Sequence, residues 1–163
     1  MVSGRTRQGG RPVLSFDGNS GDGAMQTIVE IGHEEALLAV QTVVDALKRR
    51  GKTAVVAVAD RHGELVALVR CNGAPYSCNT FASNKAYTAA RERKLSGDIG
   101  RSIKADGWDI AFMGDPHFTG WDGGVPVTVA GEVVGAIAVS GLTGEEDVEL
   151  AEMAARRIEE SVR

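Results

Sequence analysis

Apolar residues recur every three or four positions in two stretches of the chain, and this spacing predicts two amphipathic helices. The first spans residues 33–50, where Glu34 and Glu35 suit the positive end of the helix dipole. The second begins at Thr143, whose spacing to Glu146 is that of a capping box. The predicted apolar faces consist of aliphatic side chains: Ala36, Leu37, Val40, Val43, Val44 and Leu47 in the first helix, and Val148, Ala151, Ala155, Ile158 and Val162 in the second.

Short apolar runs on either side of two tight turns predict two β-hairpins. The first hairpin covers residues 53–70 and turns at residues 60–63, and the second covers residues 125–141 and turns at Ala130 and Gly131. The first strand of the first hairpin is apolar on both faces. We therefore expect that strand to lie centrally in a sheet that is covered on each side.

Two shorter helices and an irregular segment lie between the hairpins. Residues 81–90 have the pattern of a helix built mostly from small side chains, and residues 95–104 form a short helix with Ser96 as its expected N-cap. Residues 106–124 have the composition of a mixed strand and loop. This order of elements predicts an α+β fold with about five strands in a mostly antiparallel sheet and helices packed on it.

The beginning of the chain differs in composition from the rest. Residues 1–24 are rich in Gly, Arg, Ser and Asp and have little periodic apolar content, so we interpret them as a disordered leader or an extension. The whole chain has 163 residues, which is a usual length for one compact unit. We expect residues 25–163 to form a single domain.

Charge and hydropathy exclude several classes of partner. The net charge is −4 without any basic block, which argues against nucleic acid. No apolar run approaches the roughly 20 residues needed to span a bilayer, and the first residues lack the apolar segment of a secretory signal. We therefore expect a cytoplasmic protein with no membrane partner, in which Cys71 and Cys78 are reduced thiols that serve as small packing residues.

Four motifs, in this order, resemble the GlcG/HbpS family of haem-binding-domain-like proteins. They are VAVADRHGELVALVRCNGAP, NKAYTAA, GGVPVTVAGEVVGAIAVSG and TGEEDVELAEMAA, and the resemblance covers about residues 30–160. The same domain forms the C-terminal half of some cobalamin adenosyltransferases. The resemblance implies a profilin-like or PAS-like fold, assembly into a homo-oligomer and, in some members, binding of haem or a corrinoid-related ligand.

Lys85 lies within the second of these motifs, beside a face formed by Ala82, Ala86 and Ala89. One interpretation is that its stem covers the core while its ammonium group reaches water. The other is that Lys85 lies at the edge of the sheet and binds a carboxylate, propionate or oxyanion of a ligand. The sequence leaves both open.

The loop MGDPHFTGWDGG departs from the family in His117 and Trp121, so it is a candidate for a ligand other than haem. Asp115, His117 and Trp121 together offer a charge, an axial ligand or proton carrier, and a stacking surface. Met113 could ligate iron, although its residue type is more typical of core filling. His117 is the candidate metal ligand if haem binds.

Two hypotheses about function follow from these residues. The first is a small-molecule-binding protein for haem or a related planar ligand, acting as a carrier, sensor or accessory factor, with Lys85, Met113, His117 and Trp121 at the site. Haem would be bound noncovalently because the chain has no Cys-x-x-Cys-His motif. The alternative is a small cofactor-independent isomerase, lyase or hydrolase that acts on a carbonyl or aromatic metabolite through Lys85, Asp115 and His117.

Overall fold

The computed structural model describes residues 27–162, so the predicted leader of residues 1–24 lies outside the described residues. The chain alternates between helices and hairpins, and both predicted hairpins and both long helices are confirmed. The elements in chain order are α1 (His33–Arg50), β1 (Val55–Asp60), β2 (Leu65–Arg70), α2 (Cys78–Glu92), α3 (Ser96–Asp106), the 3-10 helix η1 (Ile110–Met113), β3 (Gly124–Val129), β4 (Glu132–Ser140) and α4 (Gly144–Ser161).

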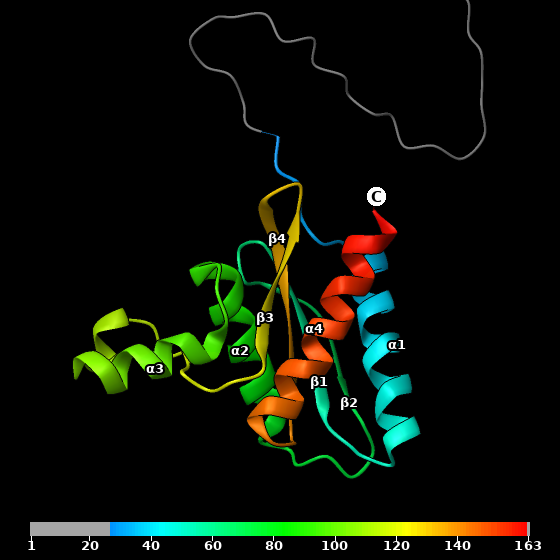
Figure 1. Ribbon diagram of the computed structural model, residues 1–163, viewed down its shortest axis with the longest axis horizontal. Helices are drawn as coiled ribbons and strands as arrows, with labels where there is room; N and C mark the ends of the chain where they lie inside the picture. The colour runs from blue at the N-terminus through cyan, green and yellow to red at the C-terminus, as the bar shows by residue number, and fades with distance from the viewer. Residues whose placement is uncertain (1–26, 163) are drawn as a thin grey trace, which may run out of the picture.

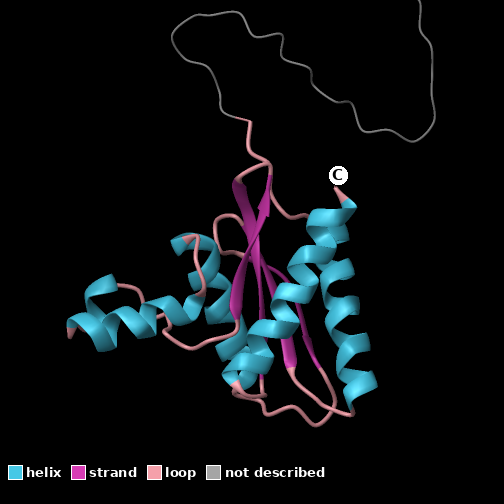
Figure 2. Ribbon diagram, viewed as in Figure 1, coloured by secondary structure: helices cyan, strands magenta, loops and turns pink. Residues whose placement is uncertain are grey.

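The strands form one antiparallel sheet in the order β2-β1-β4-β3. Helices α1 and α4 lie side by side on one face of the sheet, and α2 covers the other face (Figure 1). The α+β class and the antiparallel sheet are therefore as the sequence predicted. Helix α3 and η1 project away from the sheet beyond α2 (Figure 2).

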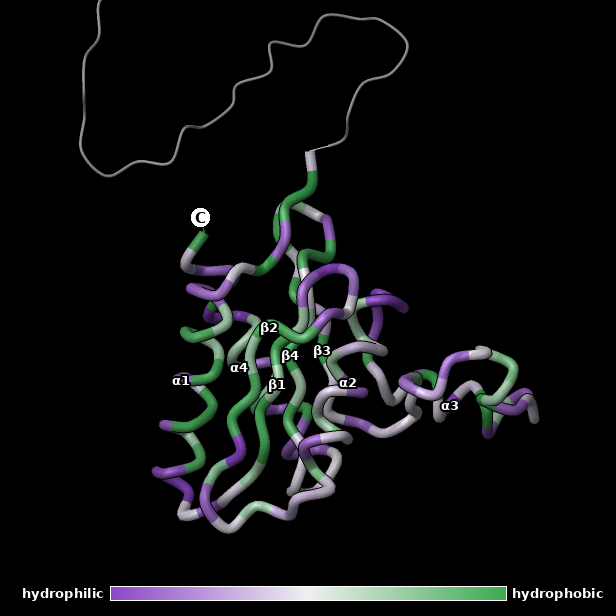
Figure 3. The backbone as a smooth tube through the Cα atoms, turned by 180° about the vertical axis from the view of Figure 1, so that it is seen from behind, coloured by the Kyte–Doolittle hydropathy of each residue, from purple (hydrophilic) through white to green (hydrophobic). Residues whose placement is uncertain are grey.

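Two apolar layers hold the helices to the sheet, and β1 contributes to both. Val56 and Val58 face α1 and α4, whereas Val55 and Ala57 face α2, and all four side chains are fully buried. Strands β1 and β4 accordingly form the hydrophobic centre of the molecule (Figure 3). The prediction that β1 lies centrally and is covered on both faces is confirmed.

The predicted fifth strand is wrong. Residues 107–123, between α3 and β3, contain no strand; they contain η1 and loops, and the sheet has four strands. Gly107 and Gly114 both have a φ of 69°, in the left-handed region, and they interrupt any extended run. Asp109 accepts a hydrogen bond from the backbone N–H of Ala111 and thereby stabilises the 3-10 turn.

The predicted helix near residues 95–104 is present, but Ser96 is not its N-cap. Leu95 holds that position, and Ser96 is the first helical residue and fully buried. The Ser96 hydroxyl donates to the backbone carbonyl of Trp121 at 2.6 Å and accepts from the N–H of Gly124 at 2.9 Å. It therefore fixes the loop that leads into β3. Among residues 27–162, no helix is long and apolar enough to cross a membrane.

Candidate functional site

Helix α2 separates two cavities. Successive residues of an α-helix point about 100° apart, so Lys85 and Tyr87 face opposite sides. Tyr87 lies in the wall of a cavity of about 570 Å³, which we call the His117 cavity because His117 and Asp115 also line it. Lys85 lies in the wall of a second cavity of about 520 Å³, the Lys85 cavity, which Trp121 also lines. The candidate residues therefore belong to two places, and the structure does not bring Lys85 together with Asp115 and His117.

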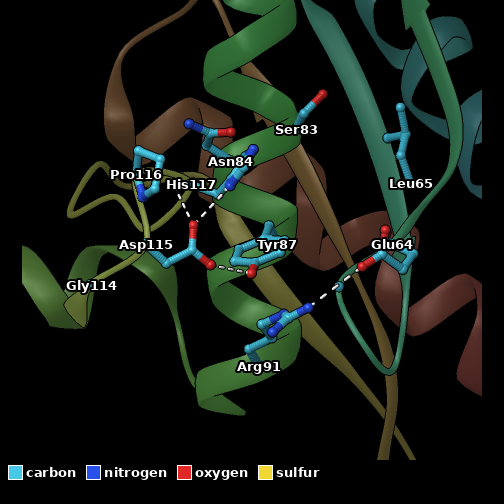
Figure 4. A pocket seen from close by; sticks show the side chains of 11 residues that line it. Glu64, Leu65, Ser83, Asn84, Tyr87, Arg91, Gly114, Asp115, Pro116 and His117 are labelled. Carbon is cyan, nitrogen blue, oxygen red and sulfur yellow. Dashed lines mark hydrogen bonds and ion pairs between the residues drawn. The ribbon is translucent and has the colours of Figure 1, made fainter.

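A hydrogen-bonded chain of three side chains lies in the wall of the His117 cavity (Figure 4). The Tyr87 hydroxyl donates to Asp115 Oδ2, and His117 Nδ1 lies 2.8 Å from Asp115 Oδ1. The backbone N–H of His117 also donates to Asp115 Oδ1, at 2.9 Å. These hydrogen bonds, that of Tyr87 foremost, lower the pKa of Asp115 from 3.8 to about 2.

The ionised Asp115 fixes the tautomer of His117. A carboxylate without a proton can only accept, so the proton of a neutral His117 ring is on Nδ1. Nε2 then carries the lone pair, and no group in residues 27–162 forms a hydrogen bond with it. The His117 side chain is 62% exposed, so Nε2 is accessible to a ligand.

Tyr87 is packed from several directions, which keeps the chain of hydrogen bonds in place. Its ring centroid lies 5.3 Å from that of His117 and 5.4 Å from that of Phe118. The guanidinium of Arg91 lies 4.3 Å from the same ring and also contacts Glu64. Burial and the hydrogen bond to Asp115 raise the pKa of Tyr87, so the hydroxyl remains a donor at neutral pH.

Lys85 in the second cavity is almost fully buried, with 5% of the residue exposed. Its Nζ donates to Asp147 Oδ2 at 3.0 Å, to the carbonyl of Val139 at 3.1 Å and to Ser140 Oγ at 3.3 Å. The interpretation in which the ammonium group reaches water is therefore wrong. That Lys85 binds an anionic group of a ligand stays a prediction. Such an anion would have to compete with the three protein acceptors for the ammonium group.

The glycine pair before β3 makes room for Lys85. A Cβ on Gly124 would lie 2.3 Å from the carbonyl oxygen of Lys85, and a Cβ on Gly123 would lie 2.9 Å from its Nζ. Gly123 also has a φ of 123°, which side chains rarely allow. Only glycine at both positions lets this loop lie directly against the lysine.

Asp147 lies in the first turn of α4 and is the partner of Lys85. Its Oδ1 accepts from the backbone N–H of Leu142 at 3.2 Å. Burial raises the pKa of Asp147, and the ammonium group of Lys85 opposes this effect. The pairing joins residues 62 positions apart, and the sequence carried no signal for it.

The remaining candidates have distinct places. Trp121 is 67% exposed at the Lys85 cavity, and Met113 ends η1 without lining either cavity. Sequence reasoning missed the roles of Tyr87 and Ser140 beside the two sites. The only available signal for Tyr87 was its position two residues after Lys85. Within the described part of the chain, no group of three or more His, Cys, Asp or Glu side chains is arranged to hold a metal ion.

Comparison of the sequence with known proteins shows the family of this chain. Residues 31–156 match the family described as haem degrading protein HbpS-like, and the protein therefore belongs to the HbpS-like family. It is 33% identical over 116 residues to the protein GlcG of Escherichia coli K12, covering 71% of this chain and 85% of GlcG. A 15.0 kDa protein from the dhaT-dhaS intergenic region of Citrobacter freundii is 32% identical over 102 residues, which is 61% of this chain and 72% of that protein.

Solved structures show the same fold. Protein ORFY of Klebsiella pneumoniae superimposes with a TM-score of 0.78 at 24% identity, covering 85% of this chain and 97% of ORFY. A double mutant of Streptomyces reticuli HbpS gives a TM-score of 0.75 at 26% identity, covering 90% and 98%. The fold also matches PduOC, solved as a complex with haem, with a TM-score of 0.72 at 18% identity over 78% of this chain and 94% of PduOC.

Proposed function

We propose that this protein binds a small planar ligand, haem or a related ring system, noncovalently in the His117 cavity. The observation that carries the proposal is the fixed imidazole of His117, with Nδ1 hydrogen-bonded to Asp115 and Nε2 free of partners in the described residues. A histidine that ligates a metal usually donates its other ring N–H to a carboxylate or carbonyl, which orients the imidazole. The family description and the haem complex of PduOC support this class of ligand.

The donor set of the His117 cavity fits such a group. His117 would hold the group through a ring nitrogen, and the ring of Tyr87 would provide a flat contact beside it. Arg91 lines the same cavity, and its guanidinium could balance the negative charge of a propionate. When bound, haem would supply an iron centre for redox or ligand-exchange chemistry, whereas the chain would supply the binding, the orientation and the ionised Asp115.

A second candidate function is cofactor-independent acid–base catalysis on a small carbonyl or aromatic metabolite. The observation that favours it is the same pair, because an ionised carboxylate behind a histidine also stabilises the imidazolium that forms when Nε2 takes up a proton. This enzyme would use His117 as the base, Asp115 to orient it and Tyr87 to hold Asp115 in place. Lys85 would not act on the same substrate, since it lies in the other cavity.

Titration with hemin tests the proposal. We expect a saturable Soret change at one hemin per chain in the wild type and in His62→Ala, which removes an imidazole from a hairpin turn. His117→Ala should weaken binding by about tenfold or more, or about 1.4 kcal/mol. Asp115→Asn should weaken hemin binding less, because the imidazole of His117 remains and only the carboxylate that orients it is lost. Equal binding by wild type and His117→Ala would overturn the assignment, and an absence of saturable binding would favour the enzyme.

A further inference from the structure

The Lys85 cavity has no part in the proposed function, yet it is a built site. It lies between α2, the loop before β3 and the first turn of α4. Its inner wall includes Lys85, Ser140 and Asp147, which meet at the lysine Nζ. The buried residues of this wall are 3% to 5% exposed, so a ligand in the cavity would meet polar atoms that are already shielded from water.

The polar wall carries no surplus charge. Lys85 is paired with Asp147 at 3.0 Å, and the other acidic group of the cavity, Asp122, is paired with Arg101 at 2.8 Å. Each of the three ammonium hydrogens of Lys85 has a protein acceptor. A carboxylate ligand would gain no net positive partner and would face two existing carboxylates, and an ammonium ligand would face Lys85.

Ser140 provides an uncharged donor in the same wall. Its Oγ accepts from Lys85 in the longest of the three contacts, 3.3 Å, and its own hydroxyl hydrogen has no acceptor among residues 27–162. A serine hydroxyl can accept and donate at once. Ser140 can therefore donate to a carbonyl oxygen in the cavity without releasing Lys85.

The mouth of the cavity offers aromatic surface. Phe81 is 43% exposed and Trp121 is 67% exposed, and both line the cavity. The backbone of Trp121 is fixed, because its carbonyl accepts from the hydroxyl of the buried Ser96, and its side chain is exposed. Exposed aromatic rings beside a few convergent polar atoms are typical of sites for flat organic ligands.

We propose that the Lys85 cavity is a second binding site, which takes a small uncharged aromatic ring bearing a carbonyl oxygen. The ring lies against Phe81 and Trp121, and the oxygen accepts from the hydroxyl of Ser140. The Lys85–Asp147 pair holds Ser140 in place and disfavours charged analogues. His117 does not line this site, since it lies on the other side of α2.

The two tryptophans of the chain allow a direct test with benzamide as the probe. The indole N–H of Trp108 donates to Ser102 and lines neither cavity, so it is an internal control. In a proton–nitrogen NMR titration, we expect the indole signal of Trp121 to shift saturably and that of Trp108 to stay in place. Benzoate and benzylamine, which differ only in the polar end, should bind at least about tenfold more weakly.

Variants separate this proposal from the previous one. Phe81→Ala, at an exposed position, should weaken benzamide binding severalfold with little change in melting temperature. Ser140→Ala should weaken benzamide binding severalfold, because the carbonyl oxygen loses its donor. His117→Ala should leave benzamide binding unchanged, whatever its effect on hemin. A Trp121 signal that does not saturate, or benzoate binding as tightly as benzamide, would overturn the assignment; tight benzoate binding would instead restore Lys85 as an anion partner.

Discussion

Ala130 adopts a backbone conformation that alanine seldom occupies, with a φ of 50° in the turn between β3 and β4. Gly131 follows with a φ of 83°, and two positive values in a two-residue hairpin turn favour Asn-Gly. We expect Ala130→Asn to raise the free energy of unfolding by about 0.5–1 kcal/mol, because asparagine tolerates the left-handed region better. Urea denaturation measures this.

The neighbouring glycine gives the matched control for that variant. Gly131→Ala should lower stability by about 1 kcal/mol, since the position has open space and only the backbone conformation opposes a side chain. If both variants shift the urea midpoint in the same direction, the turn does not have the conformation described.

Asp115 predicts a pH dependence of stability. Its pKa is lowered from 3.8 to about 2 in the folded protein, so the carboxylate stabilises the fold above pH 3.8, and this contribution is lost as the pH falls toward 2. The Asp115→Asn variant has no titrating carboxyl group at this position. Its melting temperature should therefore fall less than that of the wild type between pH 4 and pH 2. Parallel curves for the two proteins over that range would show that the hydrogen bonds from Tyr87 and His117 add no stability.

At the scale of elements, the Lys85–Asp147 pair joins α2 to α4. Removing one partner leaves a buried charge unpaired, so Lys85→Met should cost about 3–5 kcal/mol of unfolding free energy. The double variant Lys85→Met/Asp147→Leu removes both charges and should recover most of that loss. Chemical denaturation of both variants tests the expectation, and it is wrong if Lys85→Met alone is as stable as the wild type. A binding assay on Lys85→Met is therefore interpretable only beside the double variant.

The elements themselves were largely predictable from sequence, because helices and hairpins follow local periodicity. The helix α1 and the turn at Ala130 and Gly131 are where the pattern placed them. The segment of residues 106–124 was not predictable in this way, since its conformation depends on glycines at positive φ and on a local cap by Asp109.

The candidate site was predictable only in part. The structure places the predicted residues in the walls of two cavities: His117 in one, and Lys85 and Trp121 in the other. Which cavity a loop residue lines depends on the side of α2 along which that part of the loop passes. The partner of Lys85 is equally non-local, because Asp147 comes from a helix 62 residues further along. Sequence patterns indicate contacts between residues that are close along the chain. The contacts of these candidate residues are between distant segments, so they depend on the folded arrangement of the sheet and helices.

At the scale of the whole molecule, the projecting segment of α3 and η1 predicts self-association. Phe112 is 84% exposed at the end of that segment, and Tyr76 is 80% exposed elsewhere on the surface. Large exposed aromatics away from the core are typical of interaction surfaces. We expect light scattering at micromolar concentration to give a mass well above the 17.1 kDa of one chain.

Substitution on the projecting segment tests this expectation. Phe112→Ser should reduce the measured mass, whereas Leu37→Ser, at a 62% exposed position of α1, should leave it unchanged. A wild-type mass of 17.1 kDa would contradict the prediction, and an equal reduction by both variants would place the contact on another surface.

Helix α2 is a shared wall: Tyr87 faces one cavity and Lys85 faces the other. The small side chains of Ala82 and Ala86 seat it closely on the sheet, so a shift of the helix changes the shape of both cavities together. A ligand that prefers one position of the helix must then alter the affinity of the opposite cavity, and thermodynamic linkage makes that factor the same in both directions. One helix between two cavities is thus sufficient for cooperativity between two different ligands within a single chain.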